Sequence, residues 1–129
     1  MFGLDLFANE SDAEPEPMPT ADVAADDLFE ALRSARRRRV VRAVADLDTV
    51  DLGDLTEVVA SEEYDCAIVD LTHQERKRVY VSLYQTHLPK LDQLGVVDVA
   101  DDQEVQAPPA TEAAVELLAT AVEVTGGQR

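Results

Sequence analysis

Apolar residues recur at helical spacing in five segments of this chain, and the pattern predicts a mainly helical fold. The expected helices cover 26–32, 35–46, a stretch from Leu52 that fades near 61–65, then 73–94 and 112–124. In the longest of them Val79, Leu83 and Leu91 recur on one side and predict a buried stripe. We therefore expect several short helices packed around one small core.

Residues with capping side chains stand at the start of each expected helix. The expected caps are Asp26 or Asp27, Ser34, Asp51, Thr72 and Thr111. Thr72 is followed three residues later by Glu75, which is the spacing of a capping box. Pro89 lies inside the long helix and should kink it or remove one backbone hydrogen bond, whereas Gly95 should end it in a left-handed conformation.

Three short segments read as extended chain. Thr49–Val50 is a short extended piece, and the segments 96–99 and 104–106 alternate apolar and polar residues like two strands. Asp101–Asp102 supplies the turn, so the segment 96–106 is predicted to form a hairpin. The form of the apolar connection at 66–69 stays open.

The composition of the two ends divides the chain into three parts. Residues 1–24 combine a short apolar patch with acids and three prolines, and we expect a disordered acidic tail. The alternative is a short motif that docks on a protein partner. Residues 25–107 are expected to form the folded domain, and residues 108–129 a C-terminal helix with a frayed end.

The chain is strongly acidic, with a formal net charge of −16. This charge argues against nucleic acid as a partner, unless the protein is adapted to high salt, where charge repulsion is screened. Arginine far outnumbers lysine, and Ala and Val dominate the apolar set, a composition typical of a halophilic archaeon. Six of the eleven basic residues lie in Arg33–Arg42 and three in Arg76–Arg78, so the positive charge is concentrated in two places.

The remaining sequence features exclude several classes of protein. No apolar stretch is long enough to cross a membrane, and the N-terminus does not read as a signal peptide. The single cysteine, Cys66, rules out an internal disulfide and indicates a cytoplasmic location. Cys66, His73 and His87 show no metal-site spacing. We expect no catalytic residues, no metal and no cofactor.

Three sequence blocks carry a resemblance to a known family: 32–41, 50–55 and 87–97. Together with the order of the elements, they resemble winged helix-turn-helix regulators of the arsenical-repressor type. The segment 75–97 is still more similar to an uncharacterised winged-helix domain family of haloarchaea. The resemblance covers about 26–106 and implies a mainly α fold with a small β-hairpin wing. Two departures are a longer helix before His87 and the absence of that family's metal-sensing thiolate pair.

The resemblance implies that the chain is a DNA-binding transcriptional regulator, with helix 73–94 as the recognition helix and hairpin 96–106 as the wing. The candidate base-reading residues are Ser82, Gln85 and Thr86. The candidate phosphate contacts are Arg76, Lys77 and Arg78 on this helix, and Arg36, Arg38 and Arg39 on the helix 35–46. Arg37 is implied to pack within the fold.

Several roles remain open between two interpretations. Tyr80 and Tyr84 are expected in the core or in a dimer interface, and His87 is expected to pack internally with a hydrogen bond from its ring. The C-terminal helix is a candidate dimerisation element. The alternative function is a winged-helix protein-interaction module that does not bind DNA. The two functions differ in whether the arginines form one exposed patch or are neutralised by acids between Asp46 and Asp65.

Overall fold

A computed structural model describes residues 23–124 of the chain. The predicted acidic tail, apart from its last two residues, and the predicted frayed end at 125–129 lie outside the described residues. The described part is mainly helical and carries a small antiparallel sheet. No helix within 23–124 is both long and apolar enough to cross a membrane.

The described residues form six α-helices and three short strands. The helices are α1 (Ala25–Ala31), α2 (Ala35–Leu47), α3 (Leu52–Tyr64), α4 (His73–Ser82), α5 (Leu88–Gln93) and α6 (Pro109–Val124). The strands are β1 (Thr49–Asp51), β2 (Asp98–Val99) and β3 (Glu104–Gln106). The connection whose form the sequence left open contains a 3-10 turn at Ile68–Asp70. All five predicted helical segments are confirmed, with the longest one divided.

The sheet joins the predicted hairpin to the isolated extended piece. Its strand order is β1-β3-β2, and both pairs of neighbours are antiparallel. Val105 in the central strand stands opposite Val50 on one side and Val99 on the other. The hairpin is confirmed, although its first strand covers only Asp98–Val99 and not the predicted 96–99. Its pairing with Thr49–Asp51 joins the end of α2 to the segment before α6.

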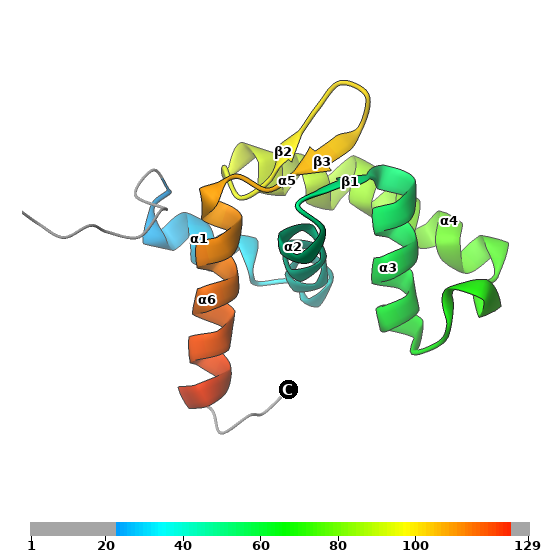
Figure 1. Cartoon of the computed structure of the whole chain (residues 1–129), viewed down its shortest axis with the longest axis horizontal. Coiled ribbons are helices and arrows are strands. Elements are labelled where there is room, and N and C mark those ends of the chain that lie inside the picture. Colours follow the sequence, from blue (N-terminus) through cyan, green and yellow to red (C-terminus); the bar gives the residue numbers. More distant parts are fainter. Residues whose placement is uncertain (1–22, 125–129) are drawn as a thin grey trace, which may run out of the picture.

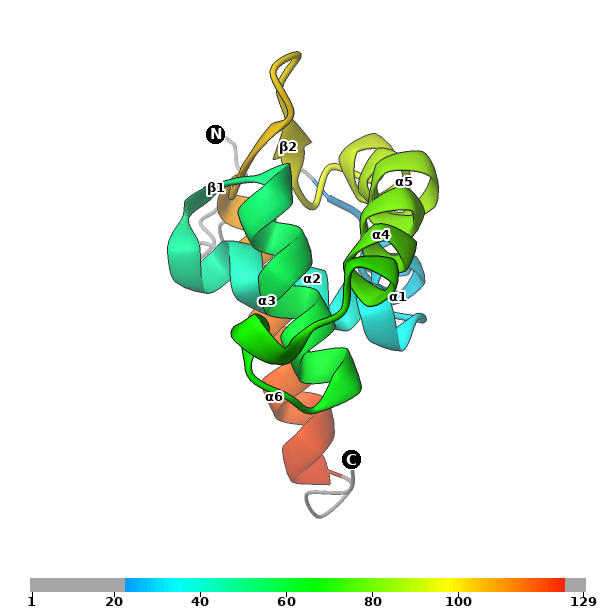
Figure 2. The same ribbon diagram turned by 90° about the vertical axis from the view of Figure 1, so that its right-hand side faces the viewer.

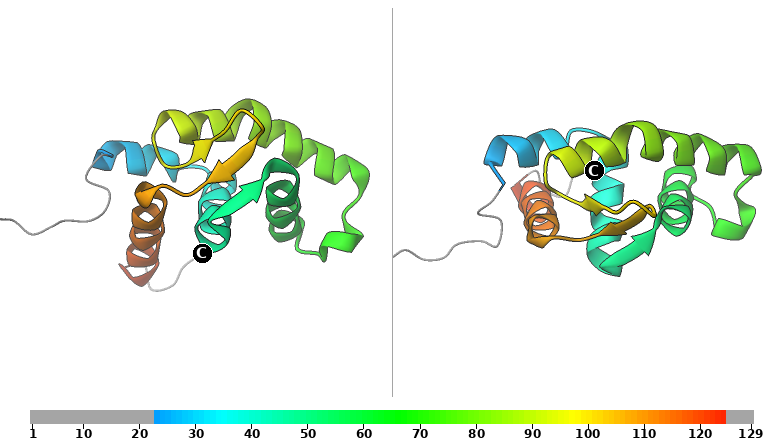
Figure 3. Two further views of the ribbon diagram at one scale, coloured as in Figure 1. Left: turned by 45° about the horizontal axis from the view of Figure 1, so that its top comes forward. Right: turned by 90° about the horizontal axis from the view of Figure 1, so that it is seen from above.

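The helices surround α2, which lies between α6 and α3 (Figure 1). The segment from α4 to α5 runs as one rod past α2 and α3, and the hairpin lies against its α5 end (Figure 3). We call residues His73–Gln93 the long helix. The core lies between these elements and contains mainly branched aliphatic side chains; the largest fully buried ones include Leu55, Leu83, Leu91, Val40, Val44 and Val105.

The predicted caps are correct at three helices and wrong at two. The side chains of Ser34 and Asp51 accept hydrogen bonds at the starts of α2 and α3, and Thr72 and Glu75 form the predicted capping box. Helix α1 instead starts after Ala24, which offers no capping side chain. Thr111 lies inside α6, because that helix already begins at Pro109.

Pro89 affects the long helix through the turn that precedes it. Residues Leu83–His87 form a π turn, in which the backbone N–H of Leu88 donates to the carbonyl of Leu83, five residues earlier. The wider turn ends next to Pro89, which lacks an N–H of its own. Gly95 then closes the helix with φ +82°, and the N–H of Val96 donates to the carbonyl of Leu91 at 2.9 Å. The predicted perturbation and the predicted glycine end are both confirmed.

Candidate nucleic-acid interface

The outward side of the long helix carries no acidic residue over most of its length. From Arg76 to Leu91 the sequence contains no Asp or Glu, although the chain has 27 of them. Gln74, Arg78, Val81 and Gln85 are exposed and follow one another at intervals of four, three and four residues. Side chains at this spacing lie in one line along a helix. We call these four residues the outer row.

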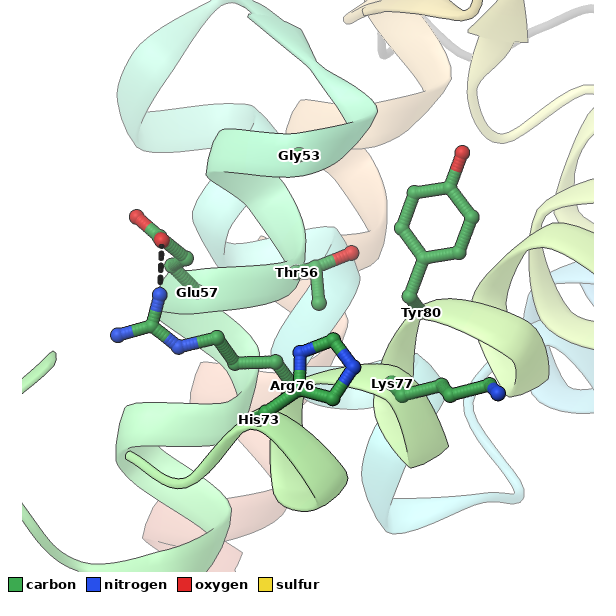
Figure 4. Close-up of a pocket in the computed structure, with 7 residues that line it drawn as sticks. All are labelled: Gly53, Thr56, Glu57, His73, Arg76, Lys77 and Tyr80. Carbon is green, nitrogen blue, oxygen red and sulfur yellow. Dashed lines mark hydrogen bonds and ion pairs between the residues drawn. The ribbon is translucent and has the colours of Figure 1, made fainter. Parts of the chain in front are cut away.

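Two cations on this helix have no acidic partner among the described residues. Lys77 and Arg78 are exposed, and neither makes an ion pair with any residue in the range 23–124. In Figure 4 the amino group of Lys77 points away from the neighbouring carboxylate of Glu57. Both cations therefore stay available to an anionic partner.

Arg76 forms an ion pair and a hydrogen bond within the protein, unlike its neighbours Lys77 and Arg78, which form no ion pair with the described residues. Its Nη1 atom lies 2.7 Å from Oε2 of Glu57 on α3, and its Nη2 donates to the carbonyl of Ile68 at 2.7 Å. The dashed line in Figure 4 marks the contact with Glu57. Arg76 thus joins the start of the long helix to α3 and to the 3-10 turn before it.

The arginines at the start of α2 are also engaged. Nε of Arg36 donates to Oε1 of Glu63 at 2.8 Å, and Nη2 of Arg36 donates to the other carboxylate oxygen. Nη1 of Arg39 lies 3.9 Å from the same carboxylate. Nη1 of Arg38 donates to the carbonyl of Leu32 at 2.8 Å. Arg36, Arg38 and Arg39 are partly buried, so they do not form an exposed patch with Lys77 and Arg78.

Arg37 packs within the fold, as the resemblance implied. Its side chain is 11% exposed, and it donates to the carbonyls of Ala31 and Glu30 at 2.9 and 2.8 Å. These carbonyls belong to the last turn of α1, which has no basic residue of its own to satisfy them. Arg37 therefore fixes α1 against the start of α2.

His87 lies at the end of the π turn, close to this group of charges. Its Nδ1 atom is buried and has no hydrogen-bond partner among the described residues, so the predicted ring hydrogen bond is not made there. Burial lowers the pKa of His87, and the charges of Arg37 and Arg36 lower it further, against an opposite effect from Glu63. The ring is therefore held neutral over a wider pH range than a free histidine.

Tyr80 and Tyr84 are not core residues, which corrects one of the two expected positions. They are 37% and 50% exposed, and their rings stack on each other with centroids 6.2 Å apart. The hydroxyl of Tyr80 lies 3.3 Å from Oε1 of Gln103, just before β3. The tyrosine pair thus connects the long helix to the hairpin.

Two hollows lie on either side of this tyrosine pair. The first, of about 360 Å³, separates α3 from the start of the long helix and is lined by Thr56, His73, Lys77 and Tyr80 among others (Figure 4). The second, of about 460 Å³, lies between α5 and the hairpin and is lined partly by Tyr84, Pro89 and Val99. In Figure 2 the long helix and α3 lie side by side, with the hairpin projecting beyond them.

The predicted base-reading residues fall on two sides of the long helix. Gln85 belongs to the outer row, and Thr86 is exposed, whereas Ser82 is half-buried. The sequence interpretation missed Val81, which is 39% exposed and lies between Arg78 and Gln85 in the outer row. The absence of acids from 76 to 91 was the sequence signal that could have marked the whole face.

The outward side of the long helix offers cations, amides and a few apolar groups. Within residues 23–124 no group of three or more His, Cys, Asp and Glu side chains is placed to hold a metal ion. The cations and amides of this face can donate hydrogen bonds to anionic groups.

Comparison with known proteins gives a single family. No curated protein and no solved structure matches the chain. A family model described as a domain of unknown function, DUF7344, matches residues 29–107, from the end of α1 to the end of the hairpin. Since this match covers more than half of the chain, the protein belongs to the DUF7344 family.

Proposed function

We propose that this protein is a winged-helix transcriptional regulator of a halophilic archaeon that binds double-stranded DNA. The order of the elements supports the winged-helix assignment: α2, β1, α3, the long helix and then the β2–β3 hairpin, with β1 added to the hairpin as a third strand. In such folds a helix enters the major groove, and here the long helix takes that role. The hairpin acts as the wing.

The observation that carries this proposal is the acid-free outward face of the long helix. An acidic chain repels DNA unless the contacting surface lacks carboxylates. Lys77 and Arg78, which make no ion pair with the described residues, contact phosphates, while Gln85, Thr86 and the half-buried Ser82 reach towards base edges. Molar salt in the cell screens the repulsion by the rest of the molecule over a distance of about 3 Å.

The arginines bound to glutamates have a secondary place in this proposal. Arg36 and Arg39 would have to leave Glu63, and Arg76 would have to leave Glu57, before they could contact phosphates. We assign to these three residues mainly the role of joining helices, and to Arg38 the role of capping the end of α1. The phosphate contacts therefore centre on Lys77 and Arg78.

We also propose that the regulator is a homodimer that pairs through α6, an arrangement in which each protomer would bind one half-site. Ala110, Ala113 and Ala114 of α6 pack in the protein's own core, so removing the whole helix would disturb the fold. Light scattering of the full chain in molar potassium chloride tests the oligomeric state directly. The mass of one chain would refute the dimer.

DNA binding is tested by selecting duplexes from a random library with the full chain in molar potassium chloride. The enriched duplex is then labelled, and its affinity is measured by fluorescence anisotropy. Lys77→Gln and Arg78→Gln should each weaken binding, whereas Arg42→Gln should not. Arg42 is an exposed arginine on α2 with no ion pair among the described residues, and it serves as the matched control. Absence of enrichment would refute the proposal.

A second candidate function is favoured by the ion pairs of Glu57 and Glu63. These two acids form ion pairs with Arg36, Arg39 and Arg76. Three of the eleven basic residues are thereby neutralised, which reduces the positively charged surface. A protein-interaction module would use the exposed Tyr80, Val81 and Tyr84 as contacts. A chain that enriches no duplex, yet retains a protein partner that Tyr84→Ala releases, would establish this alternative.

A further inference from the structure

We infer that Val81 reads the methyl group of thymine in the major groove, which makes it a specificity-determining residue of the contact proposed above. This inference rests on the proposed DNA binding and deepens it. The thymine methyl is the one apolar group that a base pair offers in the major groove, and it is recognised by apolar side chains. Val81 is the one apolar member of the outer row.

The position of Val81 follows from the spacing of its neighbours. Arg78 lies one turn before it and Gln85 one turn after it, and all three are exposed. The buried side of the helix is occupied instead by Val79 and Leu83. Val81 therefore faces outward, in the middle of a row whose other members are all polar or charged.

Val81 is not one of the buried core residues in the described part of the chain. Val81 is 39% exposed and does not belong to the hydrophobic core cluster, nor to the apolar residues packed against it. Valine is also a weaker helix former than the straight-chain polar residues that usually occupy exposed positions. An apolar contact in a complex would offset both disadvantages.

The members of the outer row suit different features of neighbouring base pairs. Arginine binds guanine through two acceptors, and glutamine binds adenine in the same bidentate way. With Val81 between them, the row from Arg78 to Gln85 can recognise guanine, thymine and adenine within one short stretch of major groove. The expected binding site therefore contains at least one thymine whose methyl group matters for affinity.

The experiment removes that methyl group from the DNA. In the duplex selected by the full chain, each thymine is replaced in turn by deoxyuridine, which keeps the base pairing and lacks only the methyl. At one position the wild-type affinity should fall about fourfold, the effect of one buried methyl group. Val81→Ala should bind the unmodified duplex about fourfold more weakly and should show no further loss at that position.

Gln74→Ala is the matched control, because Gln74 lies in the same row and offers no apolar group. It should keep the full sensitivity to deoxyuridine. Thermal unfolding of each variant checks that the fold is retained. Suppose that the wild type binds duplex, but each deoxyuridine substitution lowers the affinity of Val81→Ala by the same factor as that of the wild type. That result would refute the inference and leave DNA binding intact.

Two other results would also overturn the inference, each in a recognisable way. A wild-type chain that enriches no duplex removes the proposed function and this inference together. A change in oligomeric mass caused by Val81→Ala, measured by light scattering without DNA, would place Val81 in a contact between two copies of the chain instead.

Discussion

Arg36 of α2 and Glu63 of α3 form a two-pronged ion pair between positions 27 residues apart. Nε and Nη2 of the guanidinium each donate to a different carboxylate oxygen, a geometry that lysine cannot supply. The hydrogen bonds from Arg36 lower the pKa of Glu63, and the same bonds raise the pKa of Arg36. This pair holds the N-terminal half of α2 against the end of α3.

Glu63→Gln should lower the free energy of unfolding at neutral pH by about 1–2 kcal/mol, because it leaves a half-buried guanidinium without its counterion. Since the folded protein holds the pKa of Glu63 below its ordinary value of about 4.3, the unfolded chain takes up the proton first as the pH falls. The stabilisation is therefore complete above that value and is lost as the pH falls through the folded pKa.

Urea unfolding at a series of pH values checks this prediction at one fixed salt concentration. Glu62→Gln is the matched control, because Glu62 is exposed and forms no ion pair with the described residues. A Glu63→Gln protein whose stability falls with acid as steeply as that of the wild type would contradict the assignment.

His87 should make the fold less stable below about pH 6.5, its ordinary pKa. Burial lowers the pKa of His87 in the folded protein. As the pH falls, the imidazole therefore becomes protonated in the unfolded chain before it does so in the folded protein. Stability is thus complete above the ordinary value and decreases as the pH falls below it. His87→Leu, which also removes the unpartnered Nδ1, should abolish this decrease between pH values of about 7.5 and 5.5 in urea unfolding.

His73→Gln provides the comparison for this variant, since His73 is exposed at the start of the long helix. It should leave the loss of stability at acidic pH unchanged. Retention of that loss in His87→Leu would assign it to another group.

The sequence predicted local features better than long-range ones. Ser34, Asp51, Thr72 and Gly95 mark helix ends through bonds to residues a few positions away, so their roles follow from short patterns. Thr111 also looks like a cap, but its hydroxyl is used by a carbonyl 15 positions away, which no local pattern shows.

The candidate site divides in the same way. The exposure of Lys77, Arg78 and Gln85 follows from helical periodicity, once the buried side of the long helix is known. The pairing of Arg36 and Arg76 with glutamates of α3 depends on how helices pack, and the sequence alone left it open. The four-residue spacing of Tyr80 and Tyr84 predicted a core or interface position, whereas their stacked rings are partly exposed at the surface.

Two glycines should respond in opposite directions to alanine. Gly95 has φ +82°, a conformation that a side chain disfavours, so Gly95→Ala should destabilise the fold by about 1 kcal/mol. Gly53 lies in the first turn of α3, where an added Cβ would meet only an Asp51 carboxylate oxygen at 3.5 Å. Gly53→Ala should therefore stabilise the protein by about 0.5–1 kcal/mol. Thermal unfolding of the two variants compares them, and changes of the same sign would contradict this account.

Thr111→Val should cost about 1–2 kcal/mol with almost no change in side-chain volume. The buried hydroxyl of Thr111 donates to the carbonyl of Val96 at 2.6 Å and joins α6 to the segment before β2. Valine leaves that carbonyl without this donor. Thr120→Val makes the same substitution at an exposed site of α6. It should change the free energy of unfolding by less than about 0.5 kcal/mol in either direction. Equal losses in the two variants would show that the contact with Val96 has no special weight.

Lys77 and Arg76 are adjacent in the sequence, yet they should affect DNA binding differently. Each phosphate contact contributes about 0.9 to the slope of log affinity against log salt concentration. Lys77→Gln should reduce this slope by about that amount, because Lys77 has no ion pair among the described residues and contacts a phosphate directly in the proposed complex. Arg76→Gln should change the slope much less and should instead lower the free energy of unfolding, since Glu57 and the Ile68 carbonyl already engage Arg76.

Anisotropy titrations on the selected duplex over a range of potassium chloride concentrations measure both slopes. Equal reductions by the two variants would mean that Arg76 leaves Glu57 when DNA binds.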